Sequence, residues 1–238
     1  MNTTTKDQLG RVIKEIIPVK GTRRIIGKRM KESLERSPQG TAMVKADMSG
    51  LVRYREMLKS CGENISFVDL FVKVAGLALE ENPILNSSLK ENEIIIYQSI
   101  NIGIAVFIDT SLFVPVITDV QSKSLQEISS EIKEIITKLK EKRYAEVQMS
   151  GSTFTVNNMG MLEIDGFTPF INPPEAAILG IGKTRREVVV DETDDSIVIR
   201  PMTTLSLTND HAVVDGVPVA NFLSSLKKFM NKPEEYLK

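Results

Sequence analysis

The strongest chemical signal in the 238-residue sequence is the run from Asp210 to Gly216, which reads Asp-His-Ala-Val-Val-Asp-Gly. His211 is the only histidine, so it is the obvious candidate for general-base chemistry near neutral pH. It follows a strand-like run and precedes a helical pattern, and such a turn can direct a side chain into a cleft. Asp215 is placed to orient a partner in this turn, where Gly216 lets the backbone bend. We expect the Asp215 carboxylate to pair with a cation or with backbone donors.

Other patterns are weaker candidates for chemistry. The segment 21–28 resembles a phosphate-binding loop, but five residues instead of four separate its glycines, and Arg29 replaces the Ser or Thr that would hold magnesium. A basic helix start is the better interpretation. The run Gly180-Ile181-Gly182 lacks the third glycine of a dinucleotide fingerprint, so a closely packed strand is favoured. Cys61 lies in a predicted turn with no histidine nearby, and we do not expect it to act as a nucleophile.

Composition limits the classes of function. One histidine and one cysteine exclude a multi-histidine metal site, a thiolate cage and an internal disulfide, so no metal is expected. Thirty basic and thirty-one acidic residues leave a net charge of -1, so no global basic field for nucleic acid or membrane exists. A local cluster of six basic residues lies at 20–31. It is either a solvated helix face, which we favour, or a surface that attracts a phosphorylated ligand or an acidic partner.

The chain carries the composition of a globular protein, with 42% hydrophobic and 26% charged residues. No uninterrupted apolar stretch is long enough for a membrane span, and the polar N-terminus lacks the apolar core of a secretory signal. We therefore expect a cytoplasmic protein. Residues 1–19 read as a leader or linker segment, and residues 20–238 as one core domain.

Hydrophobic periodicity predicts interspersed helices and strands. Helices are expected at 22–37, 51–58, 67–82, 124–142 and 218–230, with Ser66 as an N-cap and Asp69 three residues later. Strands are expected at 42–48, 93–98, 101–108, 112–120, 153–157, 176–181, 186–190 and 197–207. The last two flank an acidic turn and read as a hairpin. This order favours an α/β two-layer sandwich with a mixed β-sheet and helices on one face.

The segment from His211 to Gly216 resembles the His-x-x-x-Asp-Gly signature of the chloramphenicol acetyltransferase superfamily. Its continuation to Pro233 is similar to the acyltransferase core of 2-oxo acid dehydrogenase complexes. The resemblance covers nearly the whole chain, and its most specific segments are 151–160 and 167–182, which include Ile171-Asn172-Pro173-Pro174. Further matching segments are 22–30, 51–59, 65–67, 101–105 and 112–116.

This resemblance implies a chloramphenicol acetyltransferase-like trimer whose active sites lie between subunits. Acyl-dihydrolipoamide would enter from one end and coenzyme A from the other, with the lipoyl group supplied by a separate domain or chain. The trimers usually build a larger cage that works with other components of the dehydrogenase complex. The family's catalytic histidine falls on His211 and its aspartate on Asp215. Its coenzyme A contacts fall on these residues: Arg55, Ser66, Asn157 and Asn158.

Two residues depart from the family pattern. Ala212 replaces an arginine, and Asn157 replaces the serine that donates to the oxyanion of the transition state. An asparagine nitrogen can donate to an oxyanion as well, whereas its carbonyl oxygen cannot. Asn157 is therefore the third expected catalytic residue.

The preferred interpretation is a thioester acyltransferase in which His211 takes the proton of a thiol. Ordinary pKa values of a thiol and an imidazole, about 8.5 and 6.5, make that step uphill by only about 3 kcal/mol. No metal or bound redox cofactor is required. One alternative is a stand-alone chloramphenicol-type O-acetyltransferase, which Ala212 favours and the Pro173-Pro174 segment opposes. Another is a catalytically impaired scaffold, which Asn157 favours.

Overall fold

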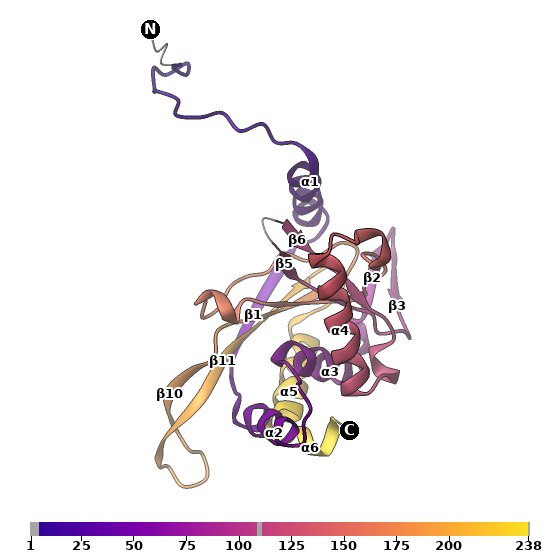
Figure 1. Cartoon of the computed structure of the whole chain (residues 1–238), viewed down its shortest axis with the longest axis vertical. Coiled ribbons are helices and arrows are strands. Elements are labelled where there is room, and N and C mark those ends of the chain that lie inside the picture. The colour runs from indigo at the N-terminus through magenta and orange to yellow at the C-terminus, as the bar shows by residue number, and fades with distance from the viewer. Residues whose placement is uncertain (1–4, 109–110, 238) are drawn as a thin grey trace.

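A seven-stranded mixed sheet forms the body of the computed structural model, which describes residues 5–108 and 111–237 (Figure 1). The sheet order is β1-β11-β9-β8-β4-β7, and β10 pairs with the outer part of β11. Strands β4, β8 and β9 are parallel, and the other pairings are antiparallel. The sheet strands are β1 (Gln39–Asp47), β4 (Ile102–Ile104), β7 (Val116–Ile117), β8 (Phe154–Asn158), β9 (Ala177–Ile181), β10 (Arg185–Val190) and β11 (Ile197–Asp210). The predicted mixed sheet is confirmed.

Six α-helices accompany this sheet in the described part of the chain: α1 (Gly21–Arg36), α2 (Ser49–Ser60), α3 (Phe67–Glu81), α4 (Leu125–Lys140), α5 (Gly216–Asn231) and α6 (Pro233–Tyr236). Short 3-10 turns lie at Pro83–Leu85, Val120–Ser122, Tyr144–Glu146 and Gly160–Leu162. Within the described residues, no helix has the length and apolar character needed to cross a membrane.

The hydrophobic core lies on one face of the sheet. Alternate strand residues point into it, as the period of two in a strand requires. In β8 these are Phe154 and Val156, and in β11 they are Leu205 and Leu207. Helices α2, α3, α4 and α5 supply most of the other half of this core. The opposite face is covered by the segment 159–176, which contains no α-helix.

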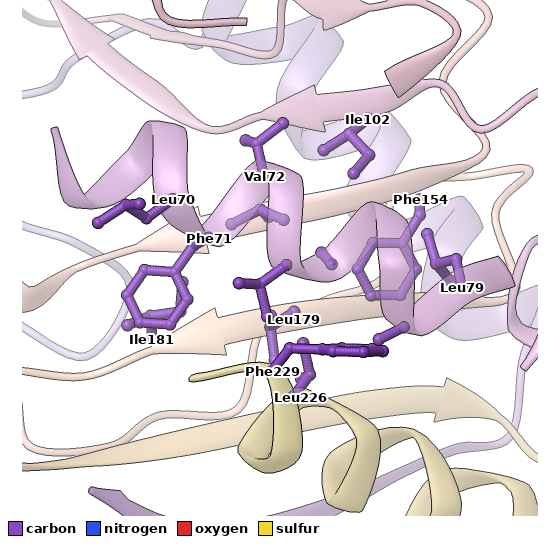
Figure 2. Close-up of a cluster of buried hydrophobic side chains, with 14 of the residues drawn as sticks. Leu70, Phe71, Val72, Leu79, Ile102, Phe154, Leu179, Ile181, Leu226 and Phe229 are labelled. Carbon is purple, nitrogen blue, oxygen red and sulfur yellow. The ribbon is translucent and has the colours of Figure 1, made fainter. Parts of the chain in front are cut away.

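Helix α3 is the centre of this core. A capping box closes its first turn, because the Ser66 hydroxyl accepts a hydrogen bond from the Asp69 amide and the Asp69 carboxylate accepts one from the Ser66 amide. Figure 2 shows Phe71 beside Ile181 of β9, and Leu79 at the other end of the helix beside Phe154. The N-terminus of α3 therefore lies at the end of the sheet where β9 finishes.

Two predicted strands are wrong in detail, because each is divided. Residues 101–108 form β4 and then β5 (Val106–Ile108), which leaves the sheet and pairs with β6 (Ser111–Phe113). The run 112–120 is divided as well, since β6 ends at Phe113 and β7 starts only after Pro115, which has no amide hydrogen to donate. The sequence also gave no sign of β2 (Ser87–Lys90), which pairs with β3 (Glu93–Ile96).

Helix α1 and the segment before it project away from the sheet (Figure 1). Ile25 and Leu34 of α1 are 64% and 52% exposed. Hydrogen bonds attach the helix to the body: the Ser33 hydroxyl donates to the Ile171 carbonyl, Arg29 donates to the Pro173 carbonyl, and the Gln39 amide of β1 donates to Ser33. A second ribbon, formed by β10 and the outer half of β11, projects at the opposite end of the molecule.

The contact between α2 and α5 depends on Gly50. A Cβ atom at this position would overlap the Met230 carbonyl oxygen and lie 2.6 Å from that of Asn231. Backbone atoms cannot rotate aside, so Gly50→Ala should lower the free energy of unfolding by about 1–3 kcal/mol in urea titrations. The control is Gly27→Ala in α1, where a Cβ meets no heavy atom within 4 Å. Equal stability of the two variants would contradict this packing account.

Candidate active site

The turn that carries His211 is held by the last two residues of β11, both of which are buried. The Asn209 amide donates to the Val214 carbonyl at 2.6 Å, and an Asp210 carboxylate oxygen accepts from the Ala212 amide at 2.9 Å. The His211 amide donates to the Pro38 carbonyl at 2.9 Å. These bonds fix the backbone on both sides of the imidazole. Sequence reasoning found His211 and missed the two residues that position it.

The imidazole and the Asp215 carboxylate lie close together. His211 Nδ1 is 3.6 Å from Asp215 Oδ1, slightly beyond hydrogen-bond length, and the two side chains are 56% and 85% exposed. Asp215 is the N-cap residue of α5, but its side chain accepts no capping bond. The Asp215 carboxylate was expected to pair with a cation or with backbone donors, and within the described residues no backbone amide donates to it. The contact with His211 remains, and a small rotation would turn it into a hydrogen bond.

His211 lies at one end of a groove of about 450 Å³ between β1 and α5. A Cβ atom on Gly40 would be 3.6 Å from the imidazole Cδ2, so the ring lies directly over this glycine. Lys227 lines the groove about eleven residues along α5 from Gly216, a distance of roughly 16 Å at the helical rise. The lining in between is mainly apolar, from Ala42, Val44, Val219, Ala220 and Leu223. Such a groove can hold a narrow, mostly apolar arm whose reactive end meets the imidazole.

Asn157 and Asn158 lie at the end of β8. Asn157 pairs in register with Gly180, and the room over this glycine is filled by the ring of Phe167. The Asn157 side chain is half-buried and forms no hydrogen bond within the described residues, so its amide is available to a ligand. The Asn158 carbonyl oxygen is already engaged, because it accepts a hydrogen bond from the Gly160 amide at 2.9 Å.

Arg55 and Ser66 lie beside each other. Arg55 donates its Nε hydrogen to the Ile65 carbonyl at 2.8 Å, and its guanidinium stacks 4.8 Å from the centre of the Phe67 ring. The remaining guanidinium nitrogens make no ion pair in the described chain. The Ser66 hydroxyl caps α3, so this residue has a structural role in addition to any contact with a ligand.

A single chain does not bring His211 and Asn157 together. In the register of the sheet, Asn157 pairs with Gly180 and Gly180 pairs with Ser206. His211 is thus two strands away from Asn157 and five residues further along, which gives a separation of roughly 19 Å. Ser66 at the start of α3, and Arg55 of α2, which bonds the neighbouring Ile65 carbonyl, belong to the same end of the sheet as Asn157. The expected site residues therefore form two groups at opposite ends of the sheet.

Glu175 is a buried carboxyl group that sequence reasoning missed. It is 4% exposed, and one of its oxygens accepts hydrogen bonds from Ser152, Thr155 and Asn172. Burial raises the pKa of Glu175 to about 7, although the three hydrogen bonds and the charge of Arg29 oppose the shift. A usable signal existed, since Glu175 is the one ionisable residue in the otherwise uncharged run 171–181. In the described part of the chain, no group of three or more His, Cys, Asp or Glu side chains is placed to hold a metal ion.

Comparison with protein families shows a match over residues 13–238 to 2-oxoacid dehydrogenases acyltransferase (catalytic domain). The chain is 36% identical over 222 residues to the dihydrolipoyllysine-residue acetyltransferase component of the acetoin cleaving system of Bacillus subtilis (strain 168), covering 91% of this chain and 55% of that protein. It is 37% identical over 220 residues to the corresponding component of the pyruvate dehydrogenase complex of the same organism, covering 90% and 49%. The chain thus spans about half the length of these relatives.

Solved structures agree with this match. A probable dihydrolipoamide acetyltransferase from Listeria monocytogenes superposes with a TM-score of 0.86 and 35% identity over 92% of this chain and 94% of that one. A chloramphenicol acetyltransferase superposes with a TM-score of 0.54 and 16% identity, covering 92% of this chain and all (100%) of that one. At that identity the likeness shows the fold alone. The predicted family and the predicted chloramphenicol acetyltransferase-like fold are both confirmed.

The raised pKa of Glu175 predicts a specific pH dependence of stability. The folded protein holds this proton more tightly than the unfolded chain, so the stabilisation is complete below the usual pKa of 4.5 and is lost as the pH rises to about 7. Relative to Glu175→Gln, the wild type should lose about 3 kcal/mol of unfolding free energy over this range. Urea titrations between pH 4 and 8 measure the difference.

The control for this titration is Glu91→Gln, which removes an exposed carboxyl group near Glu175. Its unfolding free energy should follow that of the wild type across the range. Parallel curves for the wild type and Glu175→Gln would show that burial does not shift the Glu175 pKa.

Proposed function

Because the chain belongs to the family of 2-oxoacid dehydrogenase acyltransferase catalytic domains, we propose that it transfers an acyl group between the thiols of dihydrolipoamide and coenzyme A. The observation that carries the proposal is the placement of His211 at the end of an apolar groove, in contact with Asp215. An acetyl group is the first candidate, since the named relatives are acetyltransferases.

In this proposal His211 acts as the general base. Its Nδ1 faces Asp215, so the carboxylate holds the ring and leaves Nε2 to accept the thiol proton. The thiolate attacks the acyl carbonyl, and the tetrahedral intermediate then expels the other sulfur as a thiolate, which takes the proton from the imidazolium. A carrier arm that fills the mainly apolar groove would exclude water from it and so strengthen the electrostatic interactions at the reacting end.

The oxyanion donor is the side-chain amide of Asn157 from a neighbouring copy. The separation of roughly 19 Å between His211 and Asn157 within one chain supports this arrangement. A thioester bound at His211 lies out of reach of Asn157 of the same chain. Arg55, Ser66 and Asn158 would contact coenzyme A at the Asn157 end, where the unpaired nitrogens of the Arg55 guanidinium suit a phosphate group.

We place this site in a homotrimer that assembles into a larger cage with other components of a dehydrogenase complex. Exposed apolar side chains on the two projecting elements support contacts between copies. They are Ile16, Ile17, Val19, Ile25 and Leu34 in and before α1, and Val188, Val190, Ile197 and Ile199 on the β10-β11 ribbon. Residues 20–238 would form the catalytic core, residues 1–19 the segment leading into it, and a separate domain or chain would carry the lipoyl group. The expected compartment is the cytoplasm.

Removing the imidazole tests the proposed chemistry. His211→Ala should lower the turnover number for acetyl transfer from acetyl-dihydrolipoamide to coenzyme A by at least about 100-fold, the low end of general-base contributions. The oligomeric mass and melting temperature should not change, since the imidazole side chain is 56% exposed. Lys140→Ala on the exposed side of α4 is the control and should turn over like the wild type. Wild-type turnover by His211→Ala would exclude His211 as the base.

The second candidate function is a scaffold without activity, which asparagine at position 157 favours. The same acetyl-transfer assay distinguishes it from an active acyltransferase. A scaffold shows no transfer by the wild type, and Asn157→Ser, which restores the family residue, then gains activity. If the protein is an active acyltransferase, Asn157→Ala should instead lower the rate by about 10²–10³-fold, as is typical for the loss of one oxyanion donor.

Mixing two inactive variants tests whether the site lies between copies. Chains with His211→Ala and chains with Asn157→Ala should form inactive homo-oligomers, while oligomers reassembled from both should recover part of the activity. Recovery is expected because some interfaces then pair an intact His211 with an intact Asn157 of the neighbour. A mixture that stays inactive although mass spectrometry shows mixed oligomers would contradict a shared site.

A further inference from the structure

The carboxyl group of Glu175 is hydrogen-bonded to residues from three segments of the chain. Its Oε1 atom accepts hydrogen bonds from the Ser152 hydroxyl at 2.5 Å, the Thr155 hydroxyl at 2.9 Å and the Asn172 amide at 2.7 Å. Ser152 precedes β8, Thr155 lies within it, and Asn172 belongs to the segment covering the open face of the sheet. The other oxygen, Oε2, is buried and has no hydrogen-bond partner among the described residues.

This cluster lies between the two halves of the proposed site. Thr155 and Asn157 are on the same strand and the same face, because strand side chains alternate. On the other side, the carbonyl of Ala176, the residue after Glu175, accepts the Asp210 amide at 2.8 Å. Asp210 in turn holds the His211 turn through the Ala212 amide. Glu175 is therefore next to Ala176, which bonds the His211 turn through Asp210, and is itself hydrogen-bonded to Thr155 on the strand of Asn157.

Few charged residues lie near Glu175 in the described part of the chain. A cavity of about 350 Å³ borders it, and Arg36 of α1, Glu91 of the β2–β3 turn and Asp210 of β11 also line that cavity. Arg29 of α1 is the cation whose charge favours ionised Glu175. Because Oε1 already accepts three hydrogen bonds, a proton on this carboxyl group must reside on the buried Oε2.

We propose that Glu175 is a positioning residue whose ionised form holds β8, and with it Asn157, in the geometry that stabilises the oxyanion. Hydrogen bonds to a carboxylate are shorter and roughly twice as strong as those to a neutral group. Protonation on Oε2 therefore weakens all three bonds to Oε1 at once and loosens Thr155 and its strand. This role rests on the proposed acyl transfer. The pKa of about 7 agrees with it, because the change of state then falls within the neutral range.

The test compares Glu175→Gln, a neutral side chain of the same shape, with Glu91→Gln as the matched control from the same cavity. The turnover number and both Michaelis constants are measured between pH 5.5 and 8.5. At pH 8 the Glu175→Gln turnover number should be about fivefold below wild type, as expected for a weakened hydrogen bond to a charged group. The ratio should approach 1 at pH 5.5, where the wild-type carboxyl is itself protonated, and the Michaelis constants should stay unchanged.

A merely structural role gives a different result, since a damaged fold lowers turnover by the same factor at every pH. A constant ratio across the range, or no loss at pH 8, would overturn the positioning role. Glu91→Gln should match the wild type throughout.

A second measurement does not depend on activity. The hydroxyl protons of Ser152 and Thr155, observed by NMR, should resonate further downfield in wild type than in Glu175→Gln at pH 8, because they bond to a charged oxygen, and the two proteins should agree at pH 5.5. If the wild type shows no acyl transfer, the proposed function fails while this measurement still decides the role of Glu175. Hydroxyl resonances that do not shift with pH in the wild type would refute it.

Discussion

The position of His211 depends on the hydrogen bonds that end strand β11. This strand is 14 residues long and is paired on both sides along its inner half, so its end is fixed relative to the sheet. Asn209 and Asp210 then bind the backbone of the turn that follows, at Val214 and Ala212. Both side chains are buried, and replacing either would leave a buried donor or acceptor unpaired. An exposed imidazole can be accurately aimed in this way because the groups that aim it are buried.

The sheet also determines which residues cannot meet. Register places Asn157 two strands away from β11, at the level of Ser206, and no side-chain rotation covers the remaining distance to His211. One chain therefore holds His211 at one end of the sheet and Asn157 at the other. Glu175 connects the two ends internally, through Thr155 on one side and the backbone next to Asp210 on the other. In the proposed function, a second copy would bring the opposite end into reach.

The sequence predicted the parts of this arrangement that depend on local pattern. The only histidine on a strand-to-helix turn, and the Ser66–Asp69 capping box that starts α3, are visible in short windows of sequence and are confirmed by the structure. The division of residues 101–120 into four short strands was missed, because the strand pattern continues across Ala105 and Pro115 while the pairing partners change. The partners of Glu175 lie up to 23 residues away, so neither its burial nor its pKa can be read from neighbouring residues. Asn157 was recognised from family resemblance, and its distance from His211 follows only from the register of the sheet.

The claim on which the account depends most is that one site contains His211 of one copy and Asn157 of the next. A structure of the assembled protein with coenzyme A bound, by cryo-electron microscopy or crystallography, tests it most directly. The account predicts that the thiol lies within hydrogen-bond reach, about 3 Å, of His211 Nε2 of one copy, and that Asn157 of the adjacent copy faces the same sulfur. A thiol bound away from every His211, or a site formed by residues of one chain alone, would contradict it.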